Sequence, residues 1–178
     1  MNSEQNHKIS IKEIAVFGML GALLFASKIA MEALPNIHLL ATLVISITVV
    51  YRKKALYPIY VFVFLLGLFN GFNIWWIPYL YLWTVLWAVI MLLPKNISRK
   101  KSVIIYSVIA ALHGFLYGVL YAPAQAIMFH LDFKGMVNCV ILGFPFDAIH
   151  GVSNFFCGLL IVPLIELLSR IDRLTKNT

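Results

Sequence analysis

Long apolar runs separated by short basic clusters constrain this chain more than any other feature of its sequence. Hydrophobic residues make up 62% of its 178 residues and charged residues only 12%, whereas soluble domains are about 45–50% apolar and about 25% charged. A helix that crosses a bilayer needs about 20 mostly apolar residues. The sequence therefore predicts an all-α, polytopic membrane protein, folded as a single integral membrane domain over residues 1–178.

Six apolar runs predict six transmembrane helices in a compact bundle. Proline, turn-like residues or basic clusters end each run, and the expected helices cover residues 11–34, 37–51, 55–70, 74–93, 102–121 and 137–168. The run at 37–51 is short, so whether it crosses the membrane fully stays open. We expect Pro145 to bend or break the last helix near its start, and residues 122–136 to form an amphipathic connection.

Basic clusters indicate the topology. Lys and Arg gather at 8 and 12, at 52–54, at 95–101 and at 170–176, and with six crossings these positions all fall on one face. Loops rich in Lys and Arg stay cytoplasmic. We therefore expect a multi-pass protein of the cell membrane with both termini cytoplasmic, residues 1–10 and 169–178 forming the tails. The net charge of +7 is then a topology signal, so nucleic acid is not an expected partner.

The segment GFPFDAIHGVSNFF, residues 143–156, carries polar side chains in an otherwise apolar run. At about 100° per residue, Asp147, His150 and Asn154 share one helical stripe with glycines. An ionisable group near the bilayer centre costs at least about 2.5–3.5 kcal/mol, so the stripe must face another helix or a cavity. It is either the wall of a ligand cavity or a set of helix-joining hydrogen bonds, in which Asp147 or His150 bonds to the end of a neighbouring helix. Amides freed by Pro145 are one group that Asp147 could cap. For Asn154 we expect packing.

A matching face is expected on the helix over 102–121, where Tyr106, His113 and Tyr117 line up beside glycines. His113, Asp147 and His150 show no metal-ligand spacing, so we expect no metal there. Hydrogen bonds to an organic ligand or to other helices are the expected role. Proton transfer by these three side chains, in a small polytopic membrane enzyme, is the alternative.

The aromatic segment WWIPYLYLW, residues 75–83, has two explanations. Trp and Tyr gather at membrane–water interfaces without any ligand, which suits Trp75, Trp76 and Tyr79. Trp83 and Trp87 lie deeper, where interfacial enrichment does not apply. They fit helix packing or one wall of a pocket for a large planar ligand.

Small residues repeat at every fourth position of the first expected helix, as Gly18, Ala22, Ala26 and Ala30. Residues of this size let a second helix approach closely. That second helix belongs either to the same bundle or to a separate subunit that docks on a flat, exposed strip. We call these four residues the small-residue ladder.

Motifs for hydrolysis are missing from the sequence. It contains no P-loop, no H-E-x-x-H zinc motif, no nucleophile elbow and no carboxylate pair at hydrolytic spacing. We therefore expect no catalytic residues, no ATP hydrolysis by this chain and no cofactor of its own.

In size, number of apolar runs and charge topology, the whole chain resembles the substrate-binding S-components of energy-coupling factor (ECF) type ABC vitamin transporters. The small-residue ladder is similar to the family's motif on its first helix, and GFPFDAIHGVSNFFCGLLIVPLIELL is similar to its last helix. The resemblance implies a subunit that captures a vitamin from outside. It then docks on a transmembrane scaffold subunit, which two cytosolic ATPase subunits energise, and topples so that its site opens inward.

The resemblance also implies roles for particular residues. The small-residue ladder would be the docking strip, and the outer connections at 31–37, 70–76 and 122–136 would gate the site. Ligand contacts would come from the outer halves of the last three helices. The expected contacts are Trp76, Tyr79, Trp83, Tyr117, Tyr121, Gln125, Asp147 and His150.

The expected substrate follows from the few charges of the outer half, which are Lys28, Glu32, Asp132, Lys134 and Asp147. A polyanion such as folate would need more Arg or Lys there. The chain looks most similar to the cobalamin-type S-components, and a corrinoid edged with amides suits such a lining. Another vitamin and a queuosine-like base are the alternatives, and a structural or assembly protein with a purely packing stripe is a further class. Whether the ATPase module is shared or dedicated stays open.

Overall fold

The described part of the chain is all-helical, as the sequence predicts. The computed structural model describes residues 9–34 and 36–177, with the side chains of 175–177 left aside, and this part contains helices and no strands. In chain order the helices are α1 (Ile11–Ala30), α2 (Leu40–Tyr51), η1 (Arg52–Ala55), α3 (Leu56–Asn70), η2 (Ile74–Trp76), α4 (Tyr79–Leu92), α5 (Arg99–Phe115), α6 (Tyr117–Met128), α7 (Phe133–Gly158) and α8 (Ile161–Asn177).

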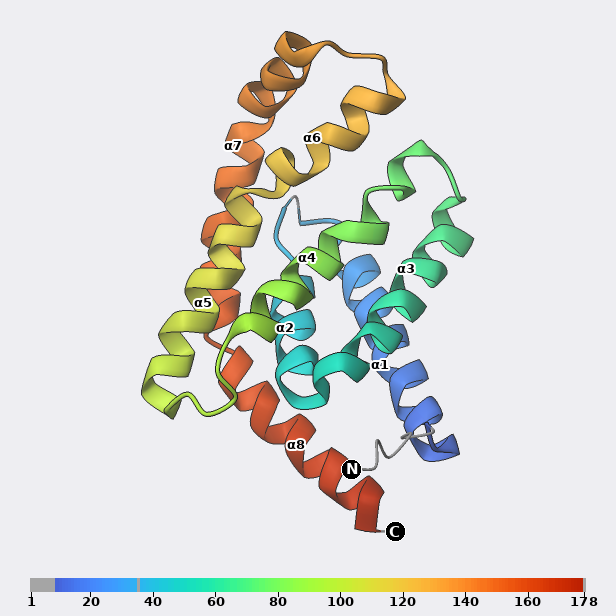
Figure 1. Cartoon of the computed structure of the whole chain (residues 1–178), viewed down its shortest axis with the longest axis vertical. Helices are drawn as coiled ribbons and strands as arrows, with labels where there is room; N and C mark the ends of the chain where they lie inside the picture. Colours follow the sequence, from blue (N-terminus) through green and yellow to red (C-terminus); the bar gives the residue numbers. More distant parts are fainter. Residues whose placement is uncertain (1–8, 35, 178) are drawn as a thin grey trace, which may run out of the picture.

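Five helical stretches in the described residues are long and apolar enough to cross a membrane. They are Ile11–Ala30, Leu40–Asn70, Ile74–Leu92, Arg99–Met128 and Phe133–Gly158. The second stretch is two helices, because Arg52 leaves helical geometry with a φ of 50° and the chain turns back there (Figure 1). The 12 residues of α2 rise only about 18 Å, short of the about 30 Å hydrocarbon core, so α2 does not cross the bilayer by itself.

The last expected helix, over 137–168, is in fact two helices. Helix α7 ends at Gly158, α8 begins at Ile161, and α8 continues through most of the segment 169–178 that the sequence suggests is a tail. Pro145 lies inside α7 and does not end it. Membrane helices tolerate proline where neighbouring groups satisfy the freed carbonyl. Hydropathy stays high across Leu159 and Leu160, so it gives no sign of the break.

The expected fifth helix is shorter than predicted. Helix α5 ends at Phe115, and Leu116 breaks the helical geometry with a ψ of 5°. The following segment forms α6, which covers the first half of the expected connection over 122–136. Figure 1 shows α6 leaving the direction of α5 at this point.

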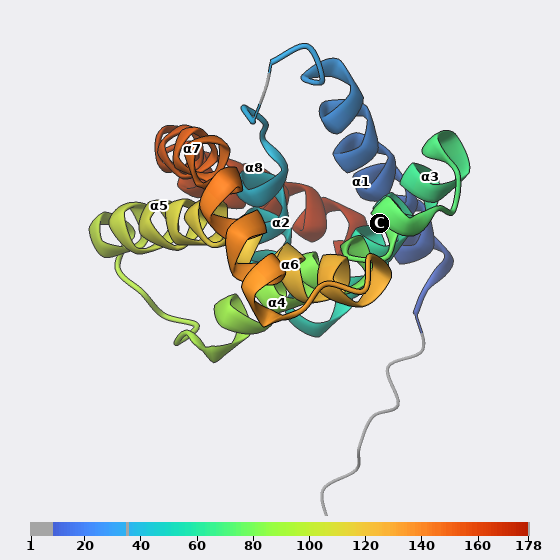
Figure 2. The ribbon, with the colours of Figure 1, turned by 90° about the horizontal axis from the view of Figure 1, so that it is seen from above.

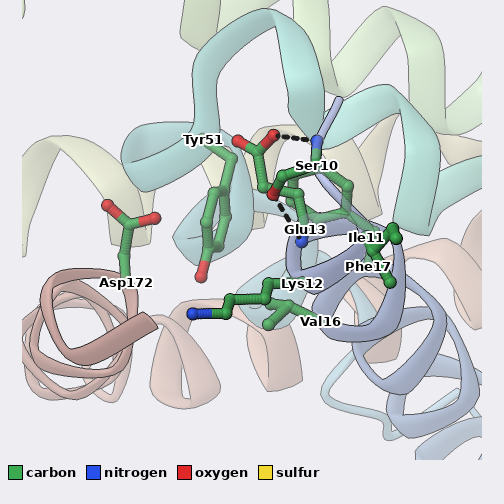
Figure 3. A pocket seen from close by; sticks show the side chains of 8 residues that line it. All are labelled: Ser10, Ile11, Lys12, Glu13, Val16, Phe17, Tyr51 and Asp172. Atoms are coloured by element: carbon green, nitrogen blue, oxygen red, sulfur yellow. Dashed lines mark hydrogen bonds between the residues drawn. The ribbon is translucent and has the colours of Figure 1, made fainter. Parts of the chain in front are cut away.

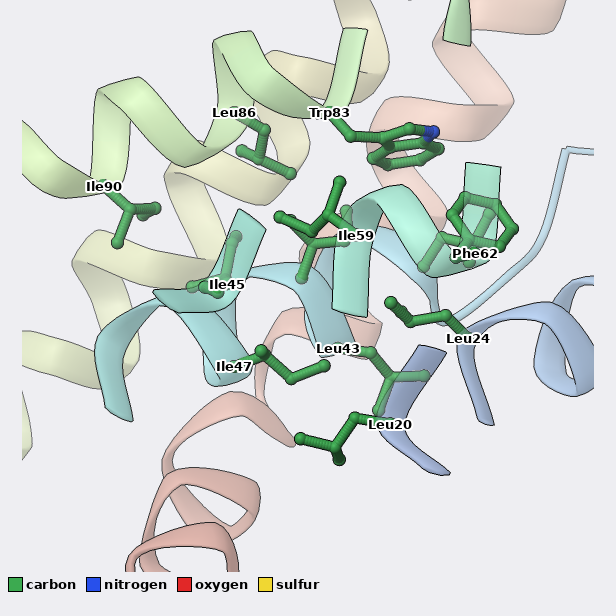
Figure 4. Packing of buried hydrophobic residues seen from close by; sticks show 14 of the residues in the cluster. Leu20, Leu24, Leu43, Ile45, Ile47, Ile59, Phe62, Trp83, Leu86 and Ile90 are labelled. Atoms are coloured by element: carbon green, nitrogen blue, oxygen red, sulfur yellow. The ribbon is translucent and has the colours of Figure 1, made fainter. Parts of the chain in front are cut away.

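Helix α2 lies in the middle of the molecule and forms the centre of the apolar core. Every residue from Leu40 to Thr48 is buried. Figure 4 shows its Leu43, Ile45 and Ile47 side chains among core residues of its neighbours, namely Leu20 and Leu24 of α1, Ile59 and Phe62 of α3, and Leu86 and Ile90 of α4. The buried Ser46 and Thr48 hydroxyls each donate to a carbonyl one turn earlier in α2, at 2.7 Å, which satisfies them without water.

Two pairs of neighbouring helices flank this centre. Seen from above, α1 and α3 lie side by side on one side, and α5 and α7 lie side by side on the other (Figure 2). The second pair approaches backbone to backbone, since a Cβ at Gly114 of α5 would overlap the backbone of Gly151 in α7. The Asn154 side chain of α7 donates to the Ala110 carbonyl of α5 at 3.2 Å, the packing role that its position in the sequence suggests.

The described residues of the basic clusters share one end of the molecule, and Lys8 lies outside the described residues. Figure 1 shows the start of α1, the turn at η1, the start of α5 and the end of α8 in its lower part. An ion pair joins Glu13 of α1 to Lys54 of η1, and another joins Arg99 of α5 to Glu166 of α8 with an Nε–Oε1 distance of 3.1 Å. The side of the membrane on which this end lies stays a prediction from charge.

Candidate ligand-binding site

Two adjoining cavities lie at the end of the molecule away from the basic clusters. The larger, here called the tryptophan cavity, has a volume of about 340 Å³. The smaller, the histidine cavity, has about 200 Å³. Both are lined by Lys28, Glu32 and Tyr79. The tryptophan cavity adds Leu66, Asn70, Gly71, Asn73, Trp75, Trp76 and Tyr121, and the histidine cavity adds Met31, Leu34, Asn36, His38, Tyr117 and His150.

Hydrogen bonds and ring contacts hold the aromatic wall of the tryptophan cavity in place. The Trp76 indole Nε1 donates to the Val63 carbonyl of α3 at 2.7 Å. Trp75 stacks on Tyr121 of α6 with ring centroids 6.5 Å apart, and the Tyr121 hydroxyl donates to the Trp75 carbonyl at 2.9 Å. At the rim, Gly71 has a φ of 84°, a turn conformation that favours glycine. The wall is therefore fixed before any ligand arrives.

Two histidines from distant parts of the chain meet in the histidine cavity. The ring centroids of His38 and His150 are 4.6 Å apart, and those of Tyr117 and His150 are 5.1 Å apart. His150 is only 3% exposed. His38 Nδ1 and His150 Nε2 are buried and have no hydrogen-bond partner in the described chain. A buried polar atom without a partner is rare in folded proteins, and here two such atoms lie at one cavity.

The charges around the two cavities balance. Lys28 and Glu32 lie one turn apart at the end of α1, with an Nζ–Oε1 distance of 3.7 Å. Burial first, and the Lys28 charge second, lower the pKa of His38 from 6.5 to about 4, so His38 is neutral at physiological pH. Among the described lining residues, one cation and one anion remain, and they face each other.

Five of the eight expected ligand contacts line these cavities, namely Trp76, Tyr79, Tyr117, Tyr121 and His150. Trp83 lines neither cavity, because it is buried in the core and only 1% exposed. Its ring centroid lies 6.0 Å from that of Phe62 and 5.5 Å from that of His113. Gln125, on α6, is also absent from both linings. The structure therefore brings together the aromatic residues and the imidazole, and leaves Trp83 to helix packing.

Asp147, like Trp83 and Gln125, is an expected ligand contact that lines neither cavity. It caps a helix instead. Its Oδ2 accepts the backbone amide of Gly118, in the first turn of α6, at 3.0 Å. A negative group near a helix N-terminus satisfies a free amide and complements the helix dipole. The capped amide belongs to the start of α6 and not to the helix around Pro145, so Asp147 bonds to the end of a neighbouring helix, as the packing interpretation expects.

His113, Asp147 and His150 do not converge. His113 Nε2 lies 3.3 Å from the Leu82 carbonyl, Asp147 binds Gly118, and His150 faces His38. In the described residues no three His, Cys, Asp or Glu side chains are grouped as a metal site. This arrangement lends no support to the proton-transfer alternative.

Sequence reasoning missed His38, the partner of His150. It lies in the connection between α1 and α2, one residue beyond the segment 31–37 that was expected to gate the site. The sequence feature that could have pointed to His38 is its imidazole in the segment PNIHLL, between two apolar runs. Nothing in the sequence alone pairs this ring with a residue more than a hundred positions later.

The small-residue ladder lies on the outside of the molecule. Ala22, Ala26 and Ala30 are exposed, and a Cβ at Gly18 would meet no described atom within 4 Å. The opposite face of α1 packs inward through Phe17, Leu20, Gly21 and Leu24. Of the two interpretations open for the ladder, packing inside this chain is therefore wrong.

A third hollow, of about 500 Å³, lies at the opposite end between the starts or ends of α1, α2 and α8. Figure 3 shows Tyr51 between Glu13 and Asp172 in this hollow. Glu13 accepts the Ser10 amide and the Ser10 hydroxyl accepts the Glu13 amide, which together cap α1. Glu13 also pairs with Lys54. These polar groups serve the helix ends, so this hollow is a weaker candidate for a ligand site.

Comparisons of the chain with protein-family models, curated proteins and solved structures found no match.

Proposed function

We propose that this protein is the substrate-capturing subunit of an ECF-type transporter in the cell membrane. The observation that carries the proposal is the pair of adjoining cavities, lined by aromatic rings and by buried imidazole nitrogens without partners. Small-molecule sites are typically concave, mostly apolar and equipped with a few converging polar groups. The two cavities are concave and carry converging polar groups at the end opposite the basic clusters, although their linings are about as polar as they are apolar.

The exposed small-residue ladder supports the proposed partners. A strip of Gly and Ala on the exposed side of α1 is flat enough for close approach by another membrane helix. The proposed partner is the transmembrane scaffold subunit, and two cytosolic ATPase subunits supply the energy. This chain contributes binding and no hydrolysis.

Contacts over the cavities support a gating role for the expected connections. The Ser153 hydroxyl of α7 donates to the Asn36 carbonyl at 3.0 Å, which ties the α1–α2 connection over the histidine cavity. The ring centroids of Trp75 and Phe129 are 5.7 Å apart, so η2 contacts the end of α6. The first contact holds one segment expected to open for ligand entry, and the second joins two of them. Toppling of the subunit would then expose the site inward.

Which substrate is captured, the corrinoid that the sequence favours or one of its alternatives, is a separate question from capture. Capture itself is tested first. The full chain should co-purify with a scaffold subunit and two ATPases, and vesicles containing that complex with ATP inside should accumulate the substrate. Absence of both results would sink the proposed function, whatever small molecule the isolated chain binds.

A further inference from the structure

The two cavities are small in this structure, and both open to the molecular surface. They measure about 340 and 200 Å³, at or below the lower end of the about 300–1,000 Å³ typical for sites of drug-sized ligands. A corrin macrocycle with its amide arms and nucleotide loop is several times larger than either cavity. Even joined across the shared Lys28, Glu32 and Tyr79, the space suits one or two rings with short substituents.

The tryptophan cavity favours a flat ring. Trp76 is held by its bond to the Val63 carbonyl, and Trp75 by its stacking on Tyr121. Aromatic side chains whose rotamers are already fixed lose little freedom when a ring packs on them. Two amides, Asn70 and Asn73, line the same cavity and offer donors and acceptors at the edge of such a ring.

The histidine cavity calls for polar atoms on the ligand. A neutral imidazole carries one donor and one acceptor. His38 Nδ1 and His150 Nε2 are both buried and without a partner in the described chain, and both side chains line this cavity. The two rings are in edge-on contact, with centroids 4.6 Å apart, so a ring nitrogen, hydroxyl or amide of a ligand would bind the pair from the side of the cavity.

Charge excludes strongly ionic ligands. Lys28 is the single cation and Glu32 the single anion among the described lining residues, and they form an ion pair with each other. A polyanion would meet one already paired ammonium group. A neutral or zwitterionic ligand leaves the pair intact or exchanges with both partners.

From these observations we infer that the ligand is a neutral or zwitterionic heteroaromatic molecule of one or two fused rings, and not a corrinoid. Its ring lies against Trp75 and Trp76, and its polar edge is bound by His38 and His150. This inference rests on the proposed function, in that it takes the two cavities as the capture site.

The first test identifies the bound molecule. The full chain is purified in mild detergent and examined by native mass spectrometry, and it is then titrated with nicotinamide, pyridoxine, adenine and cyanocobalamin by tryptophan fluorescence. The inference requires a co-purified heteroaromatic compound of one or two rings, or 1:1 binding of at least one of the three small probes. Bound corrinoid, or a chain that binds none of the small probes and carries no such compound, would overturn it.

The second test locates the bound ring. His150→Leu and Trp75→Leu should each weaken binding of that compound about tenfold or more, the loss of one hydrogen bond or one stacking partner. His130→Asn is the matched control, since this exposed histidine lies outside both linings and its φ of 52° suits Asn. Trp75 is 55% exposed, so its replacement is compatible with folding.

Unchanged affinity in both variants would overturn the placement. The two proposals fail separately. Cyanocobalamin bound 1:1 removes the ring inference and leaves capture in place, whereas a chain that binds a ring but never joins an ATPase module removes the transport function.

Discussion

The carboxylate of Asp147 on α7 accepts the backbone amide of Gly118 in the first turn of α6, with an Oδ2–N distance of 3.0 Å. Asp147 is 7% exposed, so this bond is shielded from water. It fixes the point at which α6 turns away from α5 and passes over the candidate site, with Tyr117 and Tyr121 on either side of Gly118. Asp147 thus helps to position Tyr117 and Tyr121, which line the candidate site.

Replacing Asp147 by Leu should destabilise the protein and leave ligand contacts in place. Loss of a helix cap costs about 0.5–2 kcal/mol, so we expect a lower Tm in detergent. Asp132→Ala is the comparison, because Asp132 caps α7 through Gly135 at an exposed position. A ligand affinity that falls sharply while the Tm is unchanged would instead make Asp147 a ligand contact.

Gly118→Ala should act on the same bond. A Cβ at this position would overlap the Asp147 carboxylate, so the cap must shift or break. We expect a loss of about 1–2 kcal/mol and, in a double-mutant cycle with Asp147→Leu, a combined loss smaller than the sum. Full additivity of the two unfolding free energies would show that the residues are not coupled.

Gly114 and Gly143 should respond oppositely to alanine. At Gly114 a Cβ would overlap the Gly151 backbone, whereas at Gly143 no described atom lies within 4 Å. Gly114→Ala should cost about 1–3 kcal/mol by forcing α5 and α7 apart, and Gly143→Ala should be neutral or add up to about 1 kcal/mol of helix propensity. Chemical unfolding of both variants is the measurement, and equal effects would contradict the close contact of α5 with α7.

His38 should make the fold less stable in acid. Its pKa is lowered from 6.5 to about 4, by burial first and by Lys28 second. Above pH 6.5 the residue is neutral whether the chain is folded or unfolded. Between pH 6.5 and 4 the unfolded chain binds a proton that the folded chain does not, so stability falls as pH falls, by up to about 3 kcal/mol.

The measurement is Tm against pH for the wild type and for His38→Asn, which removes the titrating group. The variant should lose less Tm between pH 6.5 and 4.5 than the wild type. His130→Asn, at an exposed position, is the control for replacing a histidine by asparagine. Identical profiles for His38→Asn and the wild type would show that His38 does not titrate in this range.

Bulk on the small-residue ladder should stop docking without harming the fold. Ala22→Leu combined with Ala26→Leu places two large side chains on the exposed face of α1, where they hinder close helix approach. We expect most ATP-driven uptake and co-purification to be lost at an unchanged Tm. Val89→Leu with Val108→Leu adds bulk at two other exposed positions, each 40% exposed, and should leave uptake intact. Undiminished uptake in the Ala variant would refute the docking role.

The class of fold follows from local sequence, whereas much of the site does not. Apolar runs predict the helices, and the period of α7 predicts that Asp147, His150 and Asn154 share a buried face, as they do. What each of them contacts depends on chain segments far away. Gly118 is 29 positions from Asp147, and no periodicity within one helix encodes that distance.

Helix ends inside apolar segments are equally hard to predict. The chain breaks at Leu159 and Leu160 and turns at Leu116, and each of these residues is as hydrophobic as its neighbours. Backbone geometry, imposed by packing against other helices, decides these ends. His38 escaped notice for a related reason, since a residue in a short connection has no helical face from which its neighbours can be inferred.

Helix α2 reads in sequence like a membrane span, yet its apolar side chains contact protein on every side from Leu40 to Thr48. The hydrophobicity of α2 is therefore explained by burial inside the protein and not by contact with lipid acyl chains. Adjustment to a thicker or thinner bilayer must then fall on the peripheral helices, through tilt or stretching of their ends. In a bilayer, the lipid composition would therefore have little effect on the middle of the molecule.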